Sequence, residues 1–152
     1  WDKITIRGVG GETLGDKWRD GPSTYYGLMT HGFPNLLMVA GPQSVSGSTN
    51  FPRAIESGVD WLTDFLGHVR SKNITRFEAR VDAEKVWGEE VVASQERMLM
   101  RRSRGWFTGY NANLEGHGED VVRYLAYWGG APQYNKIVRR VADEGYPGID
   151  LG

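Results

Sequence analysis

The stretch best suited to ligand binding lies between an apolar run and the start of a predicted helix. Residues 36–40 are all apolar, residues 41–50 are almost entirely small or polar, and helix signals begin at Thr49 or Asn50. Small residues let a flat ligand approach the backbone closely. Free N–H groups at a helix start would stabilise an anion, or a cofactor edge that becomes negative during a reaction. An ordinary connection between a strand and a helix is the alternative, and the residues alone leave both open.

Two glycine-rich segments do not fit the known nucleotide-binding patterns. Five residues separate Gly41 from Gly47, where a P-loop has four, and Ser48 stands where a P-loop has its lysine. The run GVGGET at residues 8–13 places a threonine where the third glycine of G-x-G-x-x-G is required, and a proline follows too soon for the helix that this motif needs. Neither segment by itself predicts a site for ATP, GTP or a dinucleotide.

The segment Trp106–Asn111 is a second candidate for ligand contact. It combines an indole N–H donor with small and amide side chains in an irregular stretch, which suits the orientation of a polar ligand, with core packing as the alternative. Beside it, Arg101, Arg102 and Arg104 have the charge to hold a phosphate or a single-stranded nucleic acid. A solvated helix end is the favoured interpretation of these arginines, because Arg in a last turn suits the helix dipole.

The remaining reactive residue types form no catalytic or metal-binding pattern. His31, His68 and His117 are far apart and lack the H-E-x-x-H spacing, so we expect no metal ligand among them. The chain has no cysteine and no G-x-S-x-G sequence, which excludes a thiol nucleophile and a nucleophile-elbow serine. A solvated helix face, not a catalytic pair, is the expected place of four carboxylates: Glu84, Glu89, Glu90 and Glu96.

Hydrophobic patterning predicts the elements that position these segments. Alternation predicts a strand at residues 3–7, and the apolar run 36–40 predicts a strand buried on both faces. A helix is expected to run from its cap, Thr49 or Asn50, to about Val69, with a proline tolerated in its first turn. Its expected apolar face consists of Ile55, Val59, Leu62, Leu66 and Val69.

Further along the chain the pattern predicts two more helices and short extended segments. The second helix is expected at residues 82–102, weakened by Gly88, and the third at residues 132–144, ended by Gly145. Extended segments are expected at residues 24–29, 121–127 and 149–151.

Length and composition bound the class of protein. The chain has 152 residues, a size typical of one domain, with 18 basic and 19 acidic side chains. This near-neutral charge argues against bulk nucleic-acid binding, and no apolar run approaches the roughly 20 residues that span a bilayer. Its 21 glycines, about twice the usual share, and 6 tryptophans predict a folded, loop-rich chain. Since the chain opens at Trp1 without an initiator Met, we expect it to be a piece of something longer.

Short segments run through the chain in an order that is typical of one family. They are IRGVGG at 6–11, Trp18, GP at 21–22, TYYG at 24–27, GFPNL at 32–36, GP at 41–42, IE at 55–56, WFTG at 106–109, GG at 129–130, Tyr134 and GY at 145–146. On these segments the chain resembles the carboxyl-terminal third of a type I Baeyer-Villiger monooxygenase. In that family NADPH reduces a tightly bound FAD, O2 adds to form a flavin peroxide, and the peroxide converts a ketone to an ester or lactone.

The resemblance implies an α/β fold, as the carboxyl-terminal part of a flavoprotein with two dinucleotide-binding domains. Residues 30–70 would complete the FAD-binding domain, and residues 104–118 would form a mobile loop for cofactor and substrate. The implied partners are the remainder of the same polypeptide, a small-molecule ketone and O2, in a cytoplasmic protein without nucleic acid or membrane.

The resemblance also assigns contacts to individual residues. Contacts with FAD or NADP(H) would come from Gly41, Pro42, Asn50, Phe51 and Trp106, with the Trp106 indole bonding the nicotinamide cofactor. The ketone pocket would be shaped by Ser46, Gly47, Ser48, Thr49 and Phe51. We expect no catalytic residue and no metal ligand in this chain, because the family's nucleotide motifs and the arginine that supports its flavin peroxide belong to earlier sequence. The segment alone is therefore expected to be inactive.

The chain also departs from that family. Many members follow the tryptophan with Asn-x-Pro-Gly-Lys, whereas residues 111–117 here read NANLEGH, so different loop contacts are expected. The small Gly47 and Ser48 favour the branch that accepts bulky or macrocyclic ketones. Two alternatives stay open, a related flavin N-hydroxylating monooxygenase and a non-enzymatic module that binds a ligand or RNA.

Overall fold

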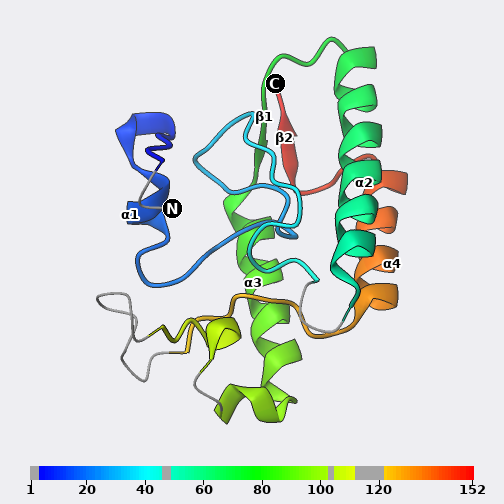
Figure 1. The fold of residues 1–152 in the computed structure, drawn as a ribbon. Coiled ribbons are helices and arrows are strands. Elements are labelled where there is room, and N and C mark those ends of the chain that lie inside the picture. The colour runs from blue at the N-terminus through cyan, green and yellow to red at the C-terminus, as the bar shows by residue number, and fades with distance from the viewer. Residues whose placement is uncertain (1–3, 46–48, 103–104, 112–121) are drawn as a thin grey trace.

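The computed structural model describes residues 4–45, 49–102, 105–111 and 122–152 (Figure 1). Its longer elements are the helices α2 (Phe51–Ser71), α3 (Val81–Glu96) and α4 (Ala131–Asp143) and the strands β1 (Phe77–Ala79) and β2 (Ile149–Leu151). Its shorter helical turns are η1 (Val9–Gly11), α1 (Leu14–Lys17), η2 (Leu99–Arg102) and η3 (Trp106–Thr108). Within this described part, no helix has the length and apolar character needed to cross a membrane.

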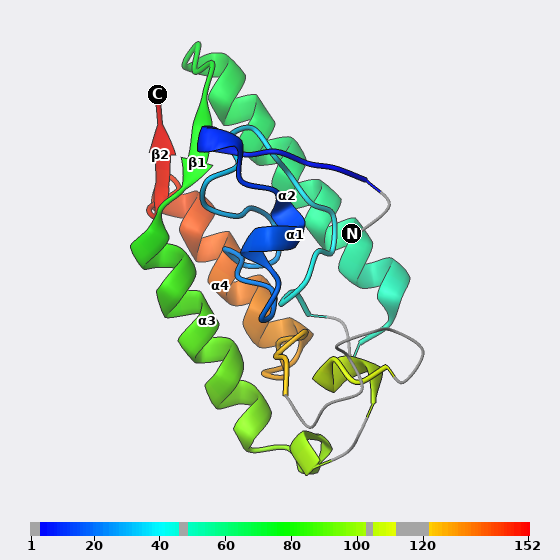
Figure 2. The same ribbon diagram turned by 90° about the vertical axis from the view of Figure 1, so that its left-hand side faces the viewer.

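The helices surround a core that the N-terminal segment covers. α2 and α4 pack side by side, and α3 lies across the core from α2 (Figures 1 and 2). β1 pairs antiparallel with β2, with Phe77 opposite Leu151, which ties the last strand to the segment between α2 and α3. The N-terminal segment, coloured blue to cyan, lies over the face that Figure 2 presents.

Local signals set two helix boundaries as predicted. The Asn50 side chain accepts a hydrogen bond from the Arg53 N–H at 3.4 Å and so caps α2, and Pro52 stands in the first turn. α4 ends just before Gly145, whose positive φ of 80° suits a residue without a Cβ.

α3 is shorter than predicted. The helix begins within one residue of the expected start but ends at Glu96, and η2 follows after a short break. Gly88 does not interrupt it. β1, which immediately precedes α3, was not predicted, because its three residues are too few to show an alternating pattern.

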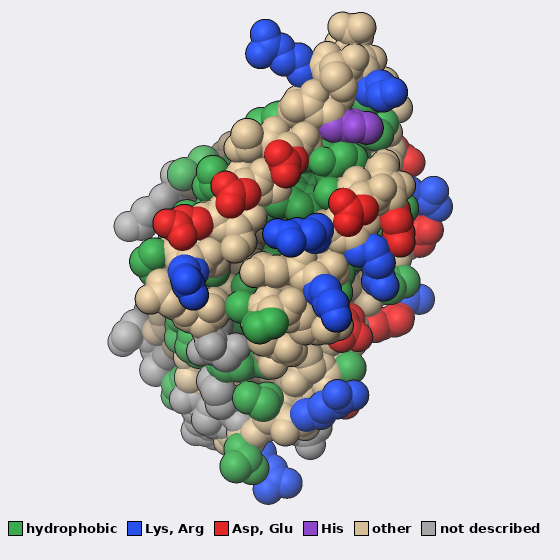
Figure 3. All heavy atoms as spheres, turned by 90° about the vertical axis from the view of Figure 1, so that its right-hand side faces the viewer, with side chains coloured by type: hydrophobic (Ala, Val, Ile, Leu, Met, Phe, Trp, Pro, Cys, Tyr) green, Lys and Arg blue, Asp and Glu red, His purple; other side chains and the backbone are tan. Residues whose placement is uncertain are grey.

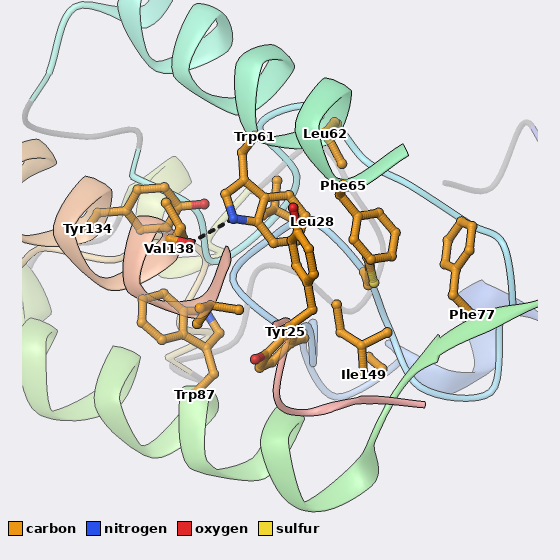
Figure 4. Packing of buried hydrophobic residues seen from close by; sticks show 14 of the residues in the cluster. Tyr25, Leu28, Trp61, Leu62, Phe65, Phe77, Trp87, Tyr134, Val138 and Ile149 are labelled. Atoms are coloured by element: carbon orange, nitrogen blue, oxygen red, sulfur yellow. Dashed lines mark hydrogen bonds between the residues drawn. The ribbon is translucent and has the colours of Figure 1, made fainter. Parts of the chain in front are cut away.

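The core between the three helices is largely aromatic (Figure 4). Trp61 and Phe65 of α2 stack with 5.4 Å between ring centroids, and the Trp61 indole donates a hydrogen bond to the Val138 carbonyl of α4 at 2.8 Å. Trp87 enters from α3, and Phe77 of β1 meets the Phe65 ring edge to face at 5.0 Å. Each such side chain stabilises the fold by about 1.5–3 kcal/mol on burial.

The buried face of α2 is only partly the predicted one. Leu62 and Val69 are buried as expected, but Ile55, Val59 and Leu66 are 38%, 44% and 46% exposed. The prediction was wrong for these three because the aromatic pair described above fills the core in their place. α2 therefore also carries an exposed apolar stripe, on a face where apolar and charged side chains mix (Figure 3).

The predicted strand at residues 36–40 is not a strand in this structure. A parallel strand needs neighbours for its backbone N–H and C=O groups, and the described part of the chain offers this segment no ladder. Its Met38 N–H donates instead to the Leu28 carbonyl at 2.9 Å. The segment stays partly open, with Val39 48% exposed.

Three other predicted extended segments form at most isolated bridges. Residues 24–29 close a turn in which the Tyr25 N–H donates to the Met29 carbonyl at 2.8 Å, so their prediction as an extended run was wrong. In the described part of the first predicted strand, Arg7 forms a single bridge with residue 13. The third segment pairs once, in a parallel bridge between Tyr127 and residue 45.

The two sides of α2 allow a matched test of this core. Phe65→Ala should lower the free energy of unfolding of the 152-residue chain by about 3–5 kcal/mol, because the ring is fully buried and its loss leaves a cavity. Leu66→Ala, one position along on the exposed stripe, should change it by no more than about 0.5 kcal/mol. Urea unfolding measures both. Equal losses for the two variants would contradict the assignment of the buried face.

Candidate functional site

A hollow of about 620 Å³, here called the candidate pocket, lies beside the start of α2. Its walls come from the N-terminal segment around α1, the segment 36–42, the start of α2, the turn at η3 and residues 123–125. Figure 2 shows α1, the start of α2 and η3 on the same side of the molecule. The lining is mainly apolar and includes Leu14, Trp18, Met38, Phe51, Trp106 and Arg123.

The backbone around Gly41 has an unusual conformation. Gly41 and Pro42, both predicted cofactor contacts, line the candidate pocket. On either side, Ala40 and Gln43 have positive φ angles of 52° and 65°, a conformation that costs a residue with a Cβ about 1–3 kcal/mol and that clusters at ligand sites.

The glycine at position 41 serves packing. A Cβ there would meet the Gly27 carbonyl oxygen at 2.6 Å, and the Gly41 N–H donates to that same oxygen at 3.0 Å. Glycine is therefore required here because the backbone at Gly41 packs directly against the backbone at Gly27. This contact holds the pocket wall against the segment 24–27.

Buried polar side chains hold the other side of this contact. The Gln43 side-chain oxygen accepts hydrogen bonds from the Thr24 N–H and hydroxyl, each at 3.0 Å, and its amide nitrogen donates to the Pro22 carbonyl at 2.8 Å. The Tyr134 hydroxyl donates to the Tyr26 carbonyl at 2.6 Å, and burial raises the pKa of Tyr134, so this phenol stays a neutral donor at physiological pH. Several side-chain hydrogen bonds thus attach the wall beside residues 41–42 to the segment 22–26.

The predicted residues at the start of α2 separate into different roles. Phe51 lines the candidate pocket and is 45% exposed. Asn50 caps the helix and is not part of the lining. Thr49 lies at a second hollow of about 340 Å³, bounded by residues of α2 and α4 that include Asp60 and Asn135. Three further predicted substrate contacts, Ser46, Gly47 and Ser48, lie outside the described residues.

A short turn presents Trp106 at the pocket. Trp106 is 70% exposed, and its ring lies 5.5 Å from that of Phe107, which in turn packs against Trp128 at 5.4 Å. The turn is closed by the buried Thr108, whose hydroxyl donates to the Gly105 carbonyl at 2.8 Å. The mobile loop predicted at residues 104–118 is described here only from 105 to 111.

Arg123, Leu14 and Trp18 are pocket residues that sequence reasoning did not single out as contacts. The Arg123 side chain passes close to two glycines with positive φ, and a Cβ on Gly109 would meet the arginine Cβ at 2.7 Å. The Arg123 N–H donates to the carbonyl of residue 108 at 2.9 Å, which joins the η3 turn to this wall. Spacing along the chain gave no signal for these residues, because the fold brings them together from segments about one hundred residues apart.

The described residues hold no group of three or more histidine and carboxylate side chains placed to bind a metal ion. Among the described residues, the lining contains a single arginine and no acidic side chain. This arrangement can bind an apolar molecule, or the apolar part of a larger one, and exclude water from it.

Comparisons with known proteins cover nearly the whole chain. No family model matches it. A phenazine N-monooxygenase of Lysobacter antibioticus is 36% identical over 151 residues, which are 99% of this chain and 27% of that protein. Cyclohexanone 1,2-monooxygenase of an Acinetobacter species is 32% identical over 149 residues, 98% of this chain and 26% of that protein. The chain thus spans about a quarter of the length of these curated relatives.

Comparison with solved structures also finds monooxygenases over nearly the whole chain. Cyclohexanone monooxygenase from a Rhodococcus species, bound to NADP+, superimposes on 99% of this chain with a TM-score of 0.88 and 32% identity, and the match covers 27% of that enzyme. A further monooxygenase solved in complex with FAD and NADP matches with a TM-score of 0.83 and 33% identity.

The fold is therefore that of a segment of an FAD- and NADP-binding monooxygenase. The resemblance to the Baeyer-Villiger monooxygenases is confirmed along almost the entire chain, as is the mixed helix and strand class.

Proposed function

We propose that this chain works as the carboxyl-terminal part of a longer Baeyer-Villiger monooxygenase, which inserts one atom of O2 next to a ketone carbonyl to give an ester or lactone. The other oxygen atom leaves as water, and NADPH supplies the two electrons. The observation that carries this proposal is the match of 97–98% of the chain to cyclohexanone and cyclopentanone monooxygenases. The mainly apolar candidate pocket, bounded by the segments for which the resemblance implies cofactor and ketone contacts, supports it.

The chain's own residues would bind and orient the reactants. When bound, FAD supplies the activation of O2. The wall at Gly41 and Pro42 would face the flat ring, and the first-turn N–H groups of α2, beyond Asn50, would stabilise negative charge on that ring. Phe51 would border the ketone and exclude water, and the exposed Trp106 indole would donate a hydrogen bond to the nicotinamide cofactor.

Two exposed surfaces support a place within a longer polypeptide. Phe51, Ile55, Val59 and Leu66 form an exposed apolar stripe on α2, and the segment 36–40 has backbone groups without a strand partner in the described part of the chain. Large apolar side chains left exposed along one side of a helix are typical of a surface that another part of the protein covers. We propose that the remainder of the protein covers both, contributes the nucleotide-binding motifs, and provides hydrogen-bond partners for the backbone of residues 36–40. The chain alone would then bind little FAD.

One observation favours a second function. The phenazine N-monooxygenase is 36% identical to this chain, against 30–34% for the ketone monooxygenases named among the relatives. Oxygen transfer to an aromatic ring nitrogen by the same cofactors is therefore the alternative.

The expectations of a cytoplasmic location and of no nucleic-acid partner stay predictions.

Turnover by the longer protein distinguishes these functions. With NADPH and air, we expect cyclohexanone to accelerate NADPH oxidation and to yield a lactone, because the described lining of the candidate pocket is mainly apolar and suits a cyclic ketone. Chromatography with mass spectrometry identifies the product. Conversion of phenazine to its N-oxide without any ketone oxidation would replace the proposed function by the alternative.

Substitution of Trp106 tests the proposed cofactor contact. Trp106→Ala should raise the KM for NADPH roughly ten-fold, as the loss of one hydrogen bond of about 1.5 kcal/mol predicts, and leave the bound FAD unchanged. Trp106→Phe retains a ring without the N–H and should behave like the alanine variant. Steady-state kinetics and the flavin absorbance measure the two quantities. A normal KM in the phenylalanine variant would show that the indole N–H plays no part.

A further inference from the structure

A buried carboxylate outside the candidate pocket joins three segments of the chain. Glu84, in the first turn of α3, is 4% exposed, although the sequence places it on a predicted solvated face. One of its oxygens, Oε2, accepts a hydrogen bond from the Lys17 ammonium at 2.9 Å. The other, Oε1, accepts from the Thr30 hydroxyl at 2.8 Å and from the His31 N–H at 3.0 Å. The expectation of a solvated face was wrong here because these partners replace water.

The two oxygens of this carboxylate hold different parts of the fold. Oε1 holds the turn at residues 30–31, whereas Oε2 holds α1 through Lys17. The Lys17 and Glu84 side chains are only 15% and 5% exposed, so each charge has lost most of its contact with water and is stabilised by the opposite charge of the other. The ion pair is therefore a specific link between α3 and α1, separate from the contacts of the turn.

α1 in turn supplies a wall of the candidate pocket. Leu14, its first residue, and Trp18, its cap, both line the pocket and are buried. A helix of four residues is too short to be stable by itself, so its position depends on what it is attached to. Lys17 immediately precedes Trp18, and its ion pair fixes the end of the helix at which this indole enters the wall.

We propose that Glu84 is a positioning residue that sets the size of ketone ring accepted by the candidate pocket, by holding the Leu14 and Trp18 wall through Lys17. The effect on which ketones are accepted rests on the proposed function. The effect of the ion pair on the position of the Leu14 and Trp18 wall is independent of that function.

Three substitutions separate this role from a general contribution to folding. In Glu84→Gln the amide oxygen must face the His31 N–H, because that group can only donate a hydrogen bond. The amide NH2 then faces the Lys17 ammonium, so two donors oppose each other and the link to Lys17 is lost. Lys17→Met removes the same link from the other side. Thr30→Val is the control, because it removes one contact of Oε1 but leaves both the ion pair and the hydrogen bond from the His31 N–H, which holds the turn, in place.

The first measurement is made on the longer, FAD-loaded protein. The ratio of kcat/KM for cyclohexanone to that for a twelve-membered ring ketone should change by about five-fold or more in Glu84→Gln and Lys17→Met, since small displacements of a binding wall alter turnover strongly. Because both substitutions break one link, the double variant should change no further. Thr30→Val should lower stability but leave the ratio within about two-fold of the unsubstituted protein. An unchanged ratio in Glu84→Gln, or an equal change in Thr30→Val, would overturn the proposal.

Hydrogen exchange of the backbone amides provides a readout that needs no activity. Exchange at residues 14–18 should be faster in Glu84→Gln and Lys17→Met than in Thr30→Val, because only the first two release α1. Equal exchange in all three would overturn the positioning role. If the unsubstituted protein oxidises no ketone, the proposed function fails, and the exchange measurement still decides whether Glu84 holds the wall.

Discussion

Two carboxylates from neighbouring elements hold one turn of the chain, and the position of the candidate pocket depends on that turn. Glu84 accepts the His31 N–H at 3.0 Å, and Glu78 of β1 accepts the Gly32 N–H at 2.8 Å. Asn35 completes the attachment, since its N–H and side-chain oxygen bond to the Phe77 backbone at 2.9 Å each. Burial alone would raise the pKa of Glu78, but hydrogen bonds from the neighbouring Arg76 guanidinium and from the Gly32 N–H hold that pKa below its usual value.

From this turn the chain passes directly into the segment 36–42 that forms one wall of the pocket. The same turn also receives the N-terminal segment, because the Val9 N–H donates to the Gly32 carbonyl at 2.8 Å. The aromatic core fixes the positions of α2, α3 and α4. The turn, which is bonded to β1 and α3, then fixes the position of the pocket walls. Segments without regular structure can therefore build a defined site, provided that charged side chains of the scaffold bind their backbone.

The sequence predicted what depends on local signals. The Asn50 cap, the course of α2 and α4, and the glycine that ends α4 follow from neighbouring residues, and all were confirmed. The apolar run 36–40 was misjudged, because a strand is defined by its neighbours and the described part of the chain supplies none. Glu84 looked like a surface carboxylate, since its partners lie 53 to 67 positions away. Of the predicted contacts, Gly41, Pro42, Phe51 and Trp106 do meet at one hollow, whereas Thr49 lies at another.

The proposed role of this chain is to complete an enzyme that transfers one oxygen atom to a ketone. The most direct test supplies the longer protein with FAD, NADPH, cyclohexanone and 18O2, and weighs the product by mass spectrometry. The proposed function predicts a lactone that carries one 18O atom. A lactone without the label, or no lactone from an FAD-loaded protein that oxidises NADPH, would contradict it.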